Sequence, residues 1–184
     1  MPVMVGLPPA VALPVGRPSL LALEMLDEHG FFEDLMAELR TADEVVATTF
    51  MYDDPRLHGV FLSRLGNPRR PFKLELMVDR QAAAGEGGRK YMRPRLRELK
   101  TAGAQVWLCD GHNHTEILGT GAGNLHGHVH VKGVVVDRRV AYTGSMNLTR
   151  AARTNREIMF KIRGPPVVQF LEHMLGFRDH GALL

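Results

Sequence analysis

The stretch HVHVKGVVVDRRVAYTGSMN, residues 128–147, joins an apolar run to a charged turn and a second apolar run. Its first part places His128, His130 and Lys132 at alternate positions. Side chains of a β-strand alternate between its two faces, so this pattern predicts that the three point to one side. Potential cations gathered on one side of an apolar strand predict that they face a negatively charged group.

The polar positions follow the spacing H-x-K-x4-D-x6-G-S-x-N, formed by His130, Lys132, Asp137, Gly144, Ser145 and Asn147. This pattern resembles the HKD motif of the phospholipase D superfamily at every defined position. Asn155 and Glu157 follow where members carry Asn-x-Glu. The similarity, over residues 128–162, is strongest to the single-motif branch, which includes small bacterial endonucleases and the Zucchini-like mitochondrial phospholipases D.

The resemblance implies a metal-independent phosphodiesterase with a histidine nucleophile. Neutral imidazole approaches a phosphodiester without charge repulsion and leaves again when the phosphohistidine is hydrolysed. His130 takes this role, while Lys132 and the Asn147 amide stabilise the phosphate oxygens and Ser145 adds a hydroxyl contact. Glu157 is expected to accept the other imidazole N–H of His130. Asp137 is carried over as the motif aspartate, with a structural role in the turn.

Some residues of this region have two readings. Ser145 and Asn147 are also expected to cap a helix beginning near Met146. His128 shares the face of His130 and either lines the site or is an ordinary strand residue. The glycine-rich segment 111–127 carries further histidines that either face substrate or bind a metal ion, namely His112, His114 and His126.

The superfamily mechanism uses two HKD histidines, one as nucleophile and one as general acid. This chain contains one His-x-Lys pair in an HKD context. The resemblance therefore implies a twofold homodimer in which both copies contribute to one shared site, without a metal ion or another cofactor.

The remaining sequence alternates helical and strand patterns and predicts an α/β protein with a mixed β-sheet flanked by helices, in a phospholipase D-like fold carrying one HKD half. Predicted strands cover residues 44–52, 72–79, 104–110, 128–137 and 157–162, with another after the turn at residue 137. Predicted helices cover residues 31–39, 54–66, 93–103 and 165–175. The segment Gln81–Gly88 is expected to be a flexible loop.

Composition sets the broad class. The 184 residues are 45% hydrophobic and 23% charged, as expected for one globular catalytic domain, which we assign to residues 19–184. Residues 1–18 are apolar and proline-rich, and predict an extended or disordered lead-in or a degenerate targeting segment. They lack the basic start of a secretory signal and make a poor membrane span, which favours an intracellular location. The single cysteine excludes an intrachain disulfide.

The net charge of +3 comes mainly from arginine, which either serves phosphate binding or reflects codon preference. Basic residues cluster at Arg89, Lys90, Arg93, Arg95 and Arg97, and again at Arg150, Arg153 and Arg156. They favour a nuclease on single-stranded nucleic acid, although a solvated helix face has the same pattern. The alternatives are a phospholipase acting on a lipid such as cardiolipin, in lipid degradation, and a non-catalytic phosphate-binding dimer.

Overall fold

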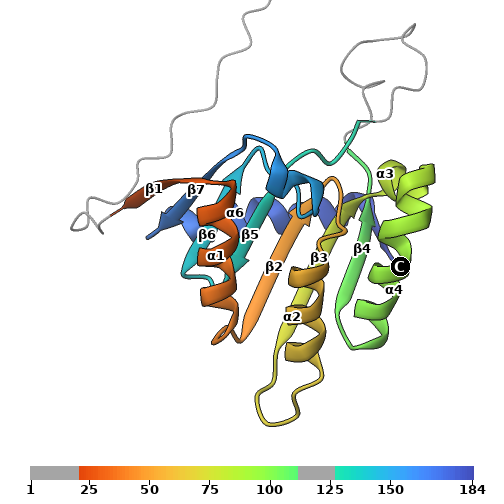
Figure 1. The fold of residues 1–184 in the computed structure, drawn as a ribbon, viewed down its shortest axis with the longest axis horizontal. Helices are drawn as coiled ribbons and strands as arrows, with labels where there is room; N and C mark the ends of the chain where they lie inside the picture. Colours follow the sequence, from red (N-terminus) through yellow and green to blue (C-terminus); the bar gives the residue numbers. More distant parts are fainter. Residues whose placement is uncertain (1–20, 112–126) are drawn as a thin grey trace, which may run out of the picture.

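A computed structural model describes residues 21–111 and 127–184, and Figure 1 shows their arrangement. Eight strands form one mixed sheet in the order β1-β7-β6-β5-β2-β3-β4-β8. Helices α1, α2 and α4 cover one face and α6 covers the other (Figure 1). The predicted α/β class and the mixed sheet flanked by helices are confirmed. The proposed lead-in, residues 1–18, lies outside the described residues.

The centre of the sheet is parallel and buried on both faces. It contains β2 (Glu44–Thr49), β3 (Lys73–Asp79) and β4 (Gln105–Cys109), paired in parallel. Helices cover both faces, so these strands are runs of apolar residues rather than alternating ones. The predicted strands are confirmed, although β2 ends three residues before the predicted Tyr52.

The second half of the sheet is antiparallel. β5 (Gly133–Val136) pairs with β2 and β6 (Val140–Gly144), and β6 pairs with β7 (Ile158–Arg163). Two strands at the sheet edges were not predicted, β1 (Ala22–Asp27) beside β7 and β8 (Gly181–Leu183) beside β4. The first is largely exposed and the second has three residues, so neither carries a strong pattern of burial.

The predicted helices are present, although α1 begins three residues before the predicted residue 31. α2 (Pro55–Leu65) starts with Asp54, whose carboxylate accepts the backbone N–H groups of Arg56 and Leu57, both at 2.9 Å. α1 (Glu28–Leu39) and α4 (Arg93–Thr101) pack on the same face of the sheet, and α6 (Pro166–Leu175) packs on the opposite face. All four predicted helices are therefore present.

The segment Gln81–Gly88 is not the loop that its composition suggested. Asp79 caps a short helix, α3 (Arg80–Ala84), by accepting the Ala82 N–H at 2.7 Å. A π-helical turn, η1 (Gly88–Met92), leads directly into α4. The alanines of this segment favour a helix once an aspartate satisfies its first N–H groups. The prediction of a loop gave more weight to the glycines than to these alanines. Short 3-10 turns, η2 (Ala151–Thr154) and η3 (Gly176–His180), complete the described structure.

Candidate active site

The His-x-Lys segment precedes β5 and is not part of it. The predicted strand 128–137 is wrong in its first half, because residues 127–132 form no ladder with a neighbouring strand. Hydrogen bonds from side chains hold this backbone instead. The Val129 N–H donates to Asp79 at 2.9 Å, and the Thr143 hydroxyl donates to the Lys132 carbonyl at 3.0 Å. Because this segment is not part of a ladder, it can present its side chains beyond the start of β5.

Phe50, directly after β2, lies among the three basic side chains of this segment, His128, His130 and Lys132. Its ring centroid is 5.5 Å from that of His128 and 5.3 Å from that of His130. The Lys132 ammonium lies 6.0 Å from the same centroid. The prediction that the three side chains gather on one side agrees with this packing. Phe50 was missed because an aromatic residue at the end of a buried strand gives no functional signal in sequence.

His130 and Lys132 contact each other directly. The Lys132 Nζ lies 2.9 Å from the His130 Nδ1 and donates to the His130 carbonyl at 2.7 Å. Lys132 is almost fully buried, whereas His130 is exposed. Because Lys132 engages Nδ1, Nε2 is the ring nitrogen left to attack a substrate, once it no longer carries the proton.

Burial and nearby charges favour a neutral His130. Burial lowers the pKa of His130 below its ordinary value, and the positive charges of Lys132 and His128 lower it further, against a smaller opposing effect of Asp79. Burial also lowers the pKa of Lys132, and the negative charge of Glu157 opposes that shift. A neutral imidazole beside an ammonium group suits nucleophilic attack on an anion.

The G-S-x-N segment follows β6 and leads back to the end of β2. The Asn147 Oδ1 accepts the Thr49 hydroxyl and the Met51 N–H, both at 3.3 Å. The Nδ2 group has no recorded partner among residues 21–111 and 127–184, so it is available as a donor. No helix begins near Met146, contrary to expectation. The chain first forms η2, where the Thr149 hydroxyl accepts the Ala152 N–H at 3.1 Å.

Gly144 allows β6 and β7 to approach closely at the start of this segment. A Cβ at this position would overlap the carbonyl oxygen of Ile158 and crowd the backbone of Met159. The Ser145 N–H then donates to the same Ile158 carbonyl at 3.0 Å. The motif glycine therefore serves the backbone path that positions Ser145 and Asn147.

Glu157 does not make the contact expected for it. Its carboxylate accepts a short hydrogen bond from the Ser145 hydroxyl and one at 3.2 Å from the Asn155 amide. Within the described chain the His130 Nδ1 faces Lys132 instead. The spacing of the motif indicated that Glu157 belongs to the site, but could not show that the ammonium of Lys132 takes the position beside Nδ1.

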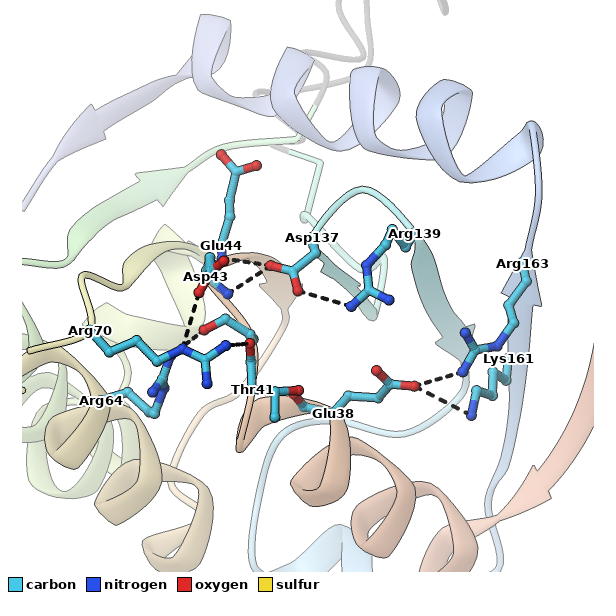
Figure 2. A network of polar contacts seen from close by, with 11 residues as sticks. Glu38, Thr41, Asp43, Glu44, Arg64, Arg70, Asp137, Arg139, Lys161 and Arg163 are labelled. Atoms are coloured by element: carbon cyan, nitrogen blue, oxygen red, sulfur yellow. Dashed lines mark hydrogen bonds and ion pairs between the residues drawn. The ribbon is translucent and has the colours of Figure 1, made fainter.

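Asp137 lies at the opposite end of β5 from Lys132, in the turn between β5 and β6. Its Oδ1 accepts the backbone N–H groups of Asp43 and Glu44 at 2.8 and 2.9 Å, and its Oδ2 pairs with Arg139 at 3.1 Å (Figure 2). Its φ of 50° is left-handed, which aspartate tolerates better than most residues. These contacts fit a structural role in fastening the turn to β2.

The hydrogen bonds to Asp137 also set its charge. Burial alone would raise the pKa of this carboxyl, but the backbone N–H groups of Glu44 and Asp43 and the Arg139 guanidinium more than offset that effect. The net pKa is below the ordinary value, so Asp137 remains ionised near neutral pH. It can then hold both backbone donors and the guanidinium together.

Asp79 was not predicted as part of the site. Its buried carboxylate accepts the Val129 N–H, caps α3 and lies 3.2 Å from the His128 Nδ1. His128 and His130 line the same cavity, of about 720 Å³, together with residues of α6 and η3. In sequence, an aspartate between a strand and a helix indicates an ordinary helix cap. Its contact with His128 becomes visible only in the fold.

The basic residues after the motif do not all face solvent. Arg153 pairs with the buried Asp54 at 3.5 Å and lies over the Phe32 ring. Arg89, Lys90 and Arg97 are exposed on η1 and α4. Part of the predicted polyanion surface is therefore structural, and part is open to solvent.

Within residues 21–111 and 127–184, no cluster of three or more histidine, cysteine, aspartate or glutamate side chains is arranged to hold a metal ion. His112, His114 and His126 lie outside the described residues. In the described part of the chain, no helix has the length and apolar character needed to cross a bilayer.

Residues 44–176 match a protein family described as cardiolipin synthase, PLD-like domain. The match runs from β2, before Phe50, to the end of α6, and it includes all the motif residues. The chain belongs to this phospholipase D-like family. The family assignment confirms the resemblance drawn from the HKD spacing, and the expected phosphodiesterase class of enzyme with it. No curated protein is similar enough in sequence to count as a match.

Solved structures of phospholipase D-like proteins share this fold. Nuc from Salmonella typhimurium, titled a phospholipase D family member, has a TM-score of 0.68 and 16% identity, over 90% of this chain and 99% of its own. NucT from Helicobacter pylori has a TM-score of 0.70 and 14% identity, over 90% of this chain and 100% of its own.

A phosphatidylserine synthase from Haemophilus influenzae has a TM-score of 0.65 and 20% identity. The match covers 92% of this phospholipase D-like chain but only 41% of the synthase. The two Nuc-type structures, by contrast, are matched over nearly their full length. The predicted phospholipase D-like fold is thus confirmed. This chain corresponds in size to one Nuc-type chain.

Proposed function

We propose that this protein is a metal-independent phosphodiesterase that acts through a phosphohistidine on His130, with single-stranded nucleic acid as substrate. The observation that carries the proposal is the joint placement of His130, Lys132 and Asn147 at one edge of the sheet. It combines a nucleophile of lowered pKa, a buried cation and a free amide donor. These are the groups that displacement at an anionic phosphorus requires.

The reaction has two steps. The His130 Nε2 attacks phosphorus, the bond from phosphorus to the leaving oxygen breaks, and a general acid protonates that oxygen. Water then attacks phosphorus, the P–N bond breaks, and the general acid recovers its proton from the water. Lys132 and Asn147 stabilise the charge that develops on the non-bridging oxygens. Ser145, held by Glu157, contributes a further hydroxyl beside them.

The general acid is assigned to His130 of a second copy, which makes the active unit a twofold homodimer. An apolar surface beside the site supports this assignment. Met25 on β1 pairs with Phe160 on β7, and both side chains are exposed, 68% and 38% respectively. Leu23 and Ile158 are exposed on the same two strands. Alternation along β7 puts them on the same side of the sheet as Ile162, which packs in the α6 cluster, so they lie on the α6 side beyond the cover of that helix.

This β1–β7 surface, formed by Leu23, Met25, Ile158 and Phe160, is continuous with the site. Ile158 directly follows Glu157, and its carbonyl accepts the Ser145 N–H. A second copy seated here would cover exposed apolar residues and bring its own motif toward the first. We therefore place the dimer interface on this surface.

A phospholipid is the second candidate substrate, with the same chemistry at phosphorus. The family description as cardiolipin synthase and the likeness to a phosphatidylserine synthase favour it. The arginine excess and the exposed basic residues favour nucleic acid. Nucleic-acid binding weakens steeply with salt, which separates the two candidates.

The test is a turnover assay in excess EDTA on single-stranded DNA, single-stranded RNA and cardiolipin vesicles, side by side. Cleavage of a nucleic acid, with binding that weakens as salt rises, is the expected result. His130→Ala should abolish it, and His29→Gln, a change to an exposed histidine on α1, should not.

Three other outcomes would contradict the proposal. Turnover of cardiolipin alone would assign the lipid substrate instead. Activity lost in EDTA and restored by zinc or magnesium would exclude histidine as the sole nucleophile. Binding of all three substrates without turnover would indicate a non-catalytic phosphate-binding dimer.

A further inference from the structure

The cavity beside His130 extends well beyond the space that one phosphate needs. Its volume is about 720 Å³, and it lies between the segment His128–Val131 and the junction of α6 with η3. Pockets of this size bind molecules as large as a nucleotide. The HKD chemistry uses His130 at its edge and leaves the rest of the cavity without a role.

His128 enters this cavity in a fixed orientation. Its Nδ1 lies 3.2 and 3.3 Å from the two carboxylate oxygens of Asp79. Asp79 is itself fully buried and is held by the N–H groups of Val129 and Ala82. A carboxylate that accepts the Nδ1 proton fixes the orientation of the ring and leaves Nε2 as the nitrogen of His128 that faces a ligand.

His128 and His130 are neighbours in the same cavity. Both line it, and both rings lie against Phe50, with centroids 5.5 and 5.3 Å from the centroid of its ring. When His130 faces the phosphate that is cleaved, His128 is placed to face a neighbouring part of the same substrate. A protonated imidazole there donates a charge-assisted hydrogen bond to a phosphate oxygen.

Part of the cavity wall is aromatic. The Phe177 and His173 rings lie 5.3 Å apart in an edge-to-face arrangement, and both residues line the cavity. Bases of single-stranded nucleic acids stack on such side chains with little dependence on sequence. An acyl chain would not use the imidazoles of this wall, so its chemistry favours a base.

We propose that this cavity is a subsite for the nucleotide next to the scissile phosphate. His128, oriented by Asp79, binds the phosphate of that nucleotide, and Phe177 and His173 receive its base. This inference rests on the proposed nuclease function and narrows it, since it requires a substrate with a second phosphate beyond the one that is cleaved.

The experiment compares a dinucleoside monophosphate with the trinucleoside diphosphate that carries one more phosphate. The wild-type kcat/KM should be higher on the longer substrate. His128→Gln should reduce the ratio of the two kcat/KM values about tenfold, the effect of losing one hydrogen bond to a charged group. Asp79→Asn should shift the same ratio in the same direction. His29→Gln, a matched change on α1, should leave it unchanged.

Phe177→Leu tests the base, because it keeps an apolar side chain but removes the ring. It should lower kcat/KM on the trinucleoside diphosphate. On the same substrate without its terminal base, Phe177→Leu and the wild type should have equal kcat/KM. If His128→Gln reduced kcat/KM on both substrates by the same factor, or on neither, the subsite would be refuted while the nuclease function stood. If the wild type cleaved neither substrate, the nuclease function itself would fail.

Discussion

The Lys132 ammonium lies 2.9 Å from the Nδ1 of His130. A charged lysine can only donate, so Nδ1 is the acceptor of this hydrogen bond. A neutral His130 then carries its proton on Nε2, the nitrogen that must attack phosphorus. Chemistry therefore requires Lys132 to turn away from the ring, which a phosphate oxygen in the site would bring about.

This geometry predicts a change of tautomer when an anion binds. Nitrogen NMR of the free protein should show neutral His130 protonated at Nε2. Added vanadate or tungstate, which mimic the phosphoryl group, should move the proton to Nδ1 because they attract Lys132. A ring that stays protonated at Nε2 in the saturated complex would contradict this prediction.

Lys132 also lowers the pKa of His130, after the larger effect of burial. Lys132→Met keeps a long apolar stem and removes the charge, so the pKa of His130 should rise toward its ordinary value. At a given mildly acidic pH, more of the imidazole would then be protonated and unable to attack. An NMR titration measures the shift, with Lys100→Met on α4 as the control that should leave it unchanged.

The covalent step predicts an acid-labile, base-stable phosphate on His130 when the reaction is quenched. His130→Ala should abolish turnover and labelling together. Glu157→Gln should slow turnover without unfolding the protein, because it weakens the hold on Ser145 and removes a negative charge that acts on Lys132. Label recovered on Ser145 instead would overturn the assignment of the nucleophile.

Asp137 should matter for folding more than for the chemical step. Asp137→Ala removes the acceptor for two backbone N–H groups and should lower the free energy of unfolding by about 1–3 kcal/mol. Asp137→Asn keeps an acceptor and tolerates the left-handed φ, so its loss should be smaller. Activity per folded molecule should stay near that of the wild type in both variants.

The stability difference between wild type and Asp137→Ala should depend on pH. The pKa of Asp137 is lowered in the folded protein, so its contribution is present above the unfolded value of about 3.9. The contribution is lost as pH falls through the folded value, and the two denaturation curves should then converge. Asp43→Asn, which removes an exposed ion pair with Arg70, should show a deficit below about 1 kcal/mol.

A shared site predicts poisoning between copies. Wild type and His130→Ala, unfolded and refolded together in equal amounts, should retain about one quarter of the activity of the same total amount of wild type. Only a dimer of two wild-type chains would have both histidines. Independent sites would retain about half. In that case the general acid would come from the same chain, with His128 or His114 the first residues to test.

The β1–β7 surface can be tested separately. Met25→Lys places a charge at its centre and should give monomers that lose activity, which sedimentation and the turnover assay would measure together. Leu183→Lys changes an exposed apolar residue on β8, at the opposite edge of the sheet, and should leave both unchanged. A dimer that survives Met25→Lys would place the interface elsewhere.

Much of the fold could be predicted because strong local patterns agree with it. The buried runs at β2, β3 and β4 and the Asp54 cap of α2 are features of the sequence itself. β1 and β8 could not be predicted, since each depends on a partner strand that is remote in sequence. The strand predicted over residues 128–132 was wrong because alternating apolar and polar residues show only that side chains point to opposite sides. They do not show that the backbone pairs with a neighbouring strand.

The candidate site divides in the same way. The spacing of the motif predicted His130, Lys132, Ser145 and Asn147 as site residues, since they flank one pair of strands, β5 and β6. Phe50 and Asp79 lie at the ends of other strands, and only the sheet order brings them to the His-x-Lys segment. The contact predicted between Glu157 and His130 is absent, because the spacing of residues cannot show whether Glu157 or Lys132 lies beside the His130 Nδ1.

The sheet order also bears on how this chain is synthesised. β5 closes the open edge of β2, yet Asp137 and Asp43, whose backbone N–H donates to it, are 94 positions apart in the chain. During translation, β2, β3 and β4 emerge long before the strand that completes them. Pairing across such a distance is slow, and an unpaired edge invites other chains. We therefore expect fragments that stop before His128 to aggregate, and productive folding to wait for the last third of the polypeptide to leave the ribosome.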